Sequence, residues 1–125
     1  MKKLVILSAV LGTAVVLSAC AEKKPLTPVE QWHGYCTSIG NAARSFLLDR
    51  QNGITLQEAE EHAAKLTDPT TKSFVEAQIK KVYAYPAADL ETDKDALMAQ
   101  FKKEATDICL ATPFDEQKLP DYKQF

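Results

Sequence analysis

The sequence predicts an all-α domain, a small bundle of about four helices with one disulfide, placed after an N-terminal segment that is removed. Beyond residue 28, apolar residues recur at steps of three and four, which is the spacing of one helix face. No segment competes with the alternating pattern of a strand. Two cysteines also lie on the apolar stripes of the first and last helical segments, which indicates a bridge between them.

The N-terminus has the parts of an export signal. Lys2 and Lys3 precede an apolar run from Leu4 to Leu17, and small residues follow that run. The run is shorter than the about 20 residues that a membrane-spanning helix needs. A secretory signal peptide over residues 1–19 therefore fits this segment better than an anchor helix.

The end of this signal is Leu17-Ser18-Ala19-Cys20, which resembles the lipobox of bacterial lipoproteins. The resemblance covers residues 1–20 alone. It implies cleavage between Ala19 and Cys20, diacylglycerol on the Cys20 sulfur, and acylation of the new amino group by a chain such as palmitate. The alternative is an ordinary signal peptide cut near Ala19 or Ala21, which leaves Cys20 as a thiol.

The residue after the lipidated cysteine bears on localisation. In Gram-negative lipoproteins an Asp there usually retains the protein in the inner membrane, whereas this chain has Ala21. The resemblance thus implies the periplasmic face of the outer membrane. We expect residues 20–28 to form the lipidated N-terminus and a tether that reaches about 25–28 Å at most. The domain of residues 29–125 then works close to its membrane.

Residues 29–52 predict the first helix, and Asn52-Gly53 ends it because Gly suits the position after a helix. The second helix is expected to begin at Thr55, which forms a capping box with Glu58. Its apolar stripe is thin. The four predicted stripes are Trp32, Tyr35, Cys36, Ile39, Ala43, Phe46 and Leu47; Leu56, Ala59, Ala63 and Leu66; Val75, Ile79, Val82 and Tyr83; and Leu97, Met98, Phe101, Ala105, Ile108 and Cys109.

Asp68-Pro69 predicts the start of the third helix, with Asp as N-cap and Pro in the first turn, and the helix stops before Pro86. The pair Thr92 and Asp95 predicts the cap of the fourth helix, which Pro113 closes. We expect the tail of residues 114–125 to be extended and to lie over the bundle.

Cys36 and Cys109 are the cysteines that remain if Cys20 carries lipid. In an oxidising compartment they predict a structural disulfide. Closing a loop of about 74 residues would constrain the unfolded chain by about 4.4 kcal/mol in the entropy model. A redox-active pair is the alternative, but such pairs are usually close in sequence, as in CxxC, and this chain has none.

Charge excludes one class of partner. The chain loses Lys2 and Lys3 with the signal. The mature chain would then keep 13 of the 15 basic residues and all 17 acidic ones, which gives it a formal charge of −4. Nucleic-acid binding needs a basic stripe, which is absent. The expected partners are the membrane, through the lipid on Cys20, and an envelope protein, while the oligomeric state stays open.

No catalytic, metal or cofactor motif emerges from the sequence. His33 and His62 lie on different helices and belong to no HxxxH or HExxH pattern, although Glu58 and His62 stand one turn apart. The serines, Ser38, Ser45 and Ser73, lie outside any GxSxG turn.

The aromatic residues allow two interpretations. Trp32, Tyr35, Tyr83 and Tyr85 could form an exposed rim for a partner. Core packing is the interpretation that we favour, because helical stripes usually face the core.

The sequence therefore predicts a membrane-anchored periplasmic lipoprotein that is not an enzyme. Its expected role is that of a binding, inhibitory or accessory module at the cell envelope. Two alternatives remain: a stress-protective periplasmic chaperone, and a hydrolase with an unrecognised site.

Overall fold

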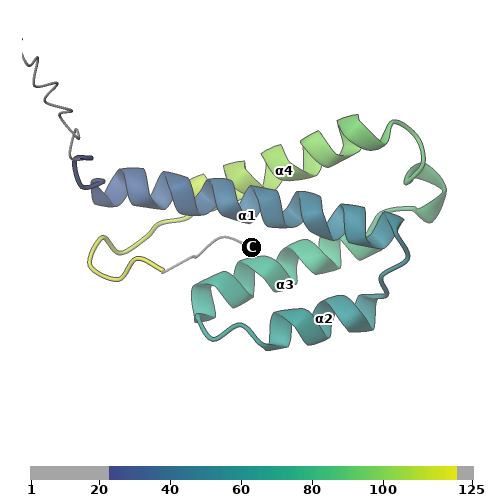
Figure 1. Cartoon of the computed structure of the whole chain (residues 1–125), viewed down its shortest axis with the longest axis horizontal. Coiled ribbons are helices and arrows are strands. Elements are labelled where there is room, and N and C mark those ends of the chain that lie inside the picture. Colours follow the sequence, from purple (N-terminus) through teal and green to yellow (C-terminus); the bar gives the residue numbers. More distant parts are fainter. Residues whose placement is uncertain (1–22, 121–125) are drawn as a thin grey trace, which may run out of the picture.

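A computed structural model describes residues 23–120, and these residues form a helical bundle without strands (Figure 1). The elements are α1 (Pro28–Gln51), α2 (Leu56–Ala64), α3 (Pro69–Ala84), the short 3₁₀ helix η1 (Ala87–Asp89) and α4 (Lys94–Leu110). Successive α-helices run in alternating directions. The predicted all-α fold class and the disulfide are both confirmed. The prediction of lipid on Cys20 falls outside the described residues.

The first helix begins slightly earlier than expected. Thr27 is its N-cap, because the Thr27 hydroxyl accepts a hydrogen bond from the Glu30 N–H, and Glu30 Oε2 accepts one from the Thr27 N–H at 2.7 Å. This is a capping box with Pro28 in the first turn. The expected tether therefore ends at Leu26, and its last two residues belong to the start of α1.

The predicted end of α1 and the predicted starts of α2 and α3 are confirmed. Gly53 follows the end of α1 with a φ of +90°, which an L side chain rarely adopts. Thr55 and Glu58 form the expected capping box of α2. Asp68 accepts a hydrogen bond from the Thr71 N–H at 2.6 Å and so caps α3.

The predicted cap of α4 was wrong by one residue. Asp93 is the N-cap, and its carboxylate accepts a hydrogen bond from the Ala96 N–H at 3.1 Å. Asp93 has a φ of +46°, in the left-handed region that Asp tolerates better than most residues. The connection before it contains η1 and buries Leu90 in the core.

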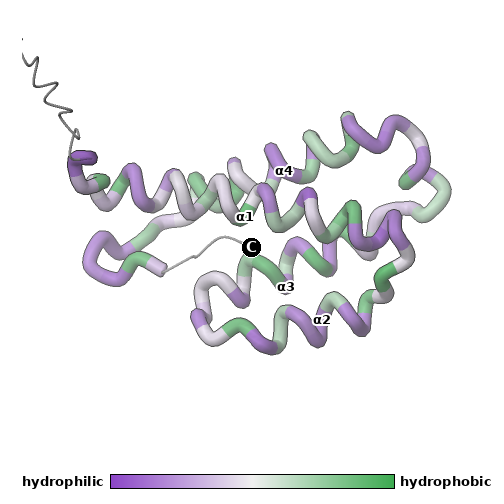
Figure 2. The backbone as a smooth tube through the Cα atoms, viewed as in Figure 1, coloured by the Kyte–Doolittle hydropathy of each residue, from purple (hydrophilic) through white to green (hydrophobic). Residues whose placement is uncertain are grey.

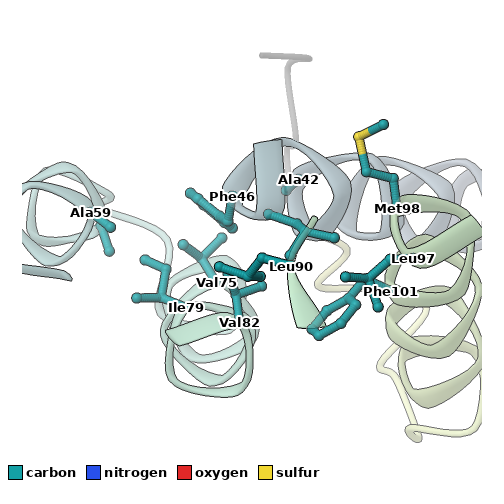
Figure 3. Packing of buried hydrophobic residues seen from close by; sticks show 12 residues of the cluster. Ala42, Phe46, Ala59, Val75, Ile79, Val82, Leu90, Leu97, Met98 and Phe101 are labelled. Carbon is teal, nitrogen blue, oxygen red and sulfur yellow. The ribbon is translucent and has the colours of Figure 1, made fainter. Parts of the chain in front are cut away.

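Each helix turns one apolar face inward, and the hydropathy colours alternate along α1, α3 and α4 (Figure 2). The core has two clusters, and α1 contributes to both. The larger one joins the second half of α1 to the other helices (Figure 3). Two stripe predictions were wrong, because Leu56 and Ile108 are exposed.

The smaller cluster surrounds the disulfide. Cys36 of α1 and Cys109 of α4 are bonded, with Cα atoms 5.3 Å apart, and both are fully buried. Trp32 stacks on Phe114 from the segment after α4, with ring centroids 4.8 Å apart. Trp32 and Tyr35 are thus core residues, as we favoured, and at Phe114 the tail does pack on the bundle.

Gly40 lets α1 and α4 approach closely. A Cβ atom added to Gly40 would lie 2.0 Å from Thr106 Oγ1 and 2.7 Å from the backbone oxygen of Lys102. Neither distance is sterically possible, so only Gly fits at this crossing. The Thr106 hydroxyl is itself fixed by a hydrogen bond to the same Lys102 oxygen, at 2.8 Å.

We predict that Gly40→Ala destabilises the domain by about 1–3 kcal/mol, because the added methyl group overpacks the α1–α4 contact. Gly34→Ala is the matched control on the same helix, since a Cβ atom there meets nothing within 4 Å. That control should gain stability by up to about 1 kcal/mol from helix propensity. Urea denaturation measures both, and equal stabilities for the two variants would disprove the close approach.

Candidate functional site

The described residues form a groove between the second half of α1 and the chain that enters and forms α2. Its volume is about 360 Å³. Its lining is Ala42, Ser45, Phe46, Asp49, Ile54, Glu58, Ala59 and His62. Four of these residues are apolar, and the other four are polar or charged. We call this feature the α1–α2 groove.

The groove exists because α2 buries little. Its buried residues are Ala59 and Ala63, and it packs chiefly on α3 rather than on α1. Alanine methyl groups are too short to fill the space towards α1. Figure 3 shows Ala59 on α2 set apart from Phe46 on α1, while Val75 and Ile79 of α3 lie between the two helices. The weak apolar stripe of α2 thus leaves a hollow whose base is apolar.

Contacts around Tyr83 fix one end of the groove. The Tyr83 hydroxyl donates a hydrogen bond to the backbone oxygen of Ile54 at 2.7 Å. The Arg50 guanidinium lies over the Tyr83 ring, 5.6 Å from its centroid, and donates to the Tyr85 oxygen at 2.7 Å. These contacts join the ends of α1 and α3 to the segment that leads into α2.

The charge on the groove is mainly negative. Asp49 lies on the α1 wall and Glu58 on the α2 wall. The carboxylate of Glu58 accepts hydrogen bonds from the Thr55 N–H and from the Thr55 hydroxyl. The backbone hydrogen bond lowers the pKa of Glu58 most and the hydroxyl adds to this, so the carboxylate is ionised at neutral pH. Burial raises the pKa of Tyr83, and the negative charge of Asp49 adds to that shift.

The side chain of Arg50, the residue after Asp49, extends to the end of α3 and is not part of the groove lining. Its guanidinium donates to the backbone oxygens of Val82 and Tyr85, at the end of α3. Helix carbonyl ends carry partial negative charge, so Arg50 stabilises that end of α3. The groove therefore keeps its acidic rim.

The groove brings together residue types that hydrolases use. Ser45 and His62 both line it, and both are exposed. Within residues 23–120, no group of three or more His, Cys, Asp or Glu side chains is placed to hold a metal ion. The arrangement offers a lined hollow that could receive a ligand or the side chains of a partner.

The other residues considered from sequence lie away from the groove. Cys36 and Cys109 are buried in the second cluster, and His33 is exposed on the first half of α1, so it shares no site with His62. Asp49 was missed from sequence, and Ser45 was noted for another reason. The signal that could have indicated a groove was the alanine stripe of the second helix.

Comparison with known proteins adds no relative: no family model matches the chain, and neither a curated protein nor a solved structure was found to match it. Within the described part of the chain, no helix is sufficiently long and apolar to span a bilayer.

Proposed function

We propose that this chain is a lipoprotein, held by lipid on Cys20 at the periplasmic face of the outer membrane, and that it acts as a non-enzymatic binding module at the cell envelope. The observation that carries the binding role is the α1–α2 groove, a hollow of about 360 Å³ with an apolar base and polar residues on its rim. The lipobox Leu17-Ser18-Ala19-Cys20 supports the anchor.

The position of the groove suits an anchored binding module. The domain begins at its cap Thr27, seven residues after Cys20, so the start of α1 lies nearest the lipid. The groove is lined by Ala42 to Asp49, about 20–30 Å further along the helix axis. A partner could therefore reach the groove while the opposite end of the bundle lies against the membrane.

The geometry favours binding over hydrolysis. A hydrolase of the serine type holds its nucleophile beside a base, usually in a recognisable turn, and Ser45 lies in no GxSxG sequence. Binding needs only an accessible surface of suitable shape and charge, which the groove supplies.

We predict that Cys20→Ala moves the protein from the membrane fraction to the soluble periplasmic fraction, because the two chains of the diacylglycerol on Cys20 and the acyl chain on its amino group provide the attachment. Mass spectrometry of the wild-type N-terminus should show a cysteine that carries acyl groups. An unmodified Cys20, or a variant that stays with the membrane, would contradict the anchor.

We also predict that a photo-crosslinking amino acid at Ser45 captures a discrete envelope protein in intact cells, because Ser45 lines the groove. Ser73 is the matched control, since it is an exposed serine on α3 outside the groove. The measurement is the set of crosslinked bands from each position. The same bands from both positions, or none from Ser45, would contradict a binding role for this groove.

A further inference from the structure

We infer that the α1–α2 groove binds an amphipathic helix with basic edges, supplied by a polypeptide partner. This inference rests on the binding function proposed above and specifies the chemistry of its ligand. It depends on three features of the groove: the length of its walls, the sign of its charges, and the exposure of its polar residues.

The walls of the groove match the repeat of a helix. On α1 the lining runs from Ala42 to Asp49, which is about 10 Å along the axis, or two turns. An apolar stripe at i, i+3 or i+4, and i+7 presents its side chains over the same distance. Ala42, Phe46 and Ala59 form the base of the groove but are buried, so the apolar stripe of a partner would contact chiefly Ile54, which is 38% exposed, and the edges of these three residues.

The charges of the groove select the sign of the partner. Asp49 and Glu58 stand on opposite walls, so a helix between them would be flanked by carboxylates on both edges. Lys or Arg beside the apolar stripe would meet them, and Asp or Glu would be repelled. The formal charge of −4 expected for the mature chain adds long-range attraction for a cationic partner.

Two other groups lie near the rim. His62 comes one turn after Glu58, and the guanidinium of Arg50 is held by carbonyl oxygens at the end of α3. Gln57 of α2 donates a hydrogen bond to Glu61, at 2.9 Å. Among the residues that line the groove, the acidic side chains are Asp49 and Glu58, and none is Lys or Arg.

The exposure of the polar residues favours a helix over a small amine. Small-molecule sites orient their ligand with a few polar groups inside a largely buried pocket. In this groove Ser45, Glu58 and His62 are exposed on the rim, and Asp49 is half-buried. The floor itself is apolar and offers no polar group to fix one small molecule. Such a surface suits the apolar face of a helix whose charges stay at the edges.

The test uses the whole mature chain, residues 20–125, with Cys20→Ala so that no detergent is needed. The probe is a synthetic 18-residue helical peptide with Leu on one face and Lys on the edges, titrated by calorimetry. We expect saturable binding at one site. A peptide of the same design with Glu in place of Lys should bind at least tenfold more weakly.

Two double variants separate the groove from general charge attraction. Asp49→Asn with Glu58→Gln should weaken binding about fivefold, and Gln at position 58 preserves the capping box. Asp95→Asn with Glu116→Gln removes two charges from exposed sites outside the groove and should leave the affinity within about twofold. Equal effects of the two pairs would overturn the inference.

A third variant tests shape. Ser45→Trp places a large side chain over the groove from an exposed helix position, so it should abolish binding while circular dichroism shows an unchanged fold. Unchanged binding by a folded Ser45→Trp protein would overturn the inference. Octylamine, which has a cation but no helix, should not bind, and binding of octylamine instead of the peptide would identify a small-amine site and overturn the helix assignment.

The outcome for the proposed function is separate. If the Leu–Lys peptide fails to bind while the crosslinker at Ser45 still captures its envelope protein, the groove is a binding site but its ligand is not a basic amphipathic helix. If both experiments fail, the binding function fails with the ligand assignment.

Discussion

The close contact between α1 and α4 is the constraint on which the rest of this structure depends. Gly40 brings the backbones together at Thr106 and Lys102, and the Cys36–Cys109 disulfide bonds the same two helices about one turn away. Because α1 and α4 are the first and last helices, this contact ties distant parts of the chain together. The other helices are then placed relative to α1: α3 by direct packing, and α2 chiefly through α3.

In this arrangement the helices are held to α1 with decreasing strength, from α4 through α3 to α2. The α1–α4 contact is covalent and closely packed, α3 adds its apolar stripe and the Tyr35–Thr71 hydrogen bond at 3.1 Å, and α2 contributes two buried alanines. The weakest attachment borders the groove. In proteins generally, elements that bind partners often belong to the less stable part of the fold. The strong α1–α4 contact therefore permits the incompletely filled contact between α1 and α2.

Local features of this fold were predictable from sequence, and tertiary features were not. The capping box at Thr55, the turn at Gly53 and the inward-facing Cys36 and Cys109 depend on neighbouring residues or on helix phase. The left-handed cap at Asp93, the tight crossing at Gly40 and the exposure of Ile108 depend on how helices meet. The groove is also a tertiary feature. Its two walls come from α1 and α2, and the apolar pattern of one helix does not determine the distance between the two.

Residue-resolved native-state hydrogen exchange tests this account most directly. We expect the slowest amide exchange in α1 and α4 around Cys36, Gly40 and Ala105, since these amides open only when the whole domain unfolds. Amides of α2 should exchange fastest among the four α-helices, through local opening that leaves α1 and α4 protected. Protection of α2 equal to that of α1 and α4 would contradict the account, because it would show that α2 unfolds only with the whole bundle.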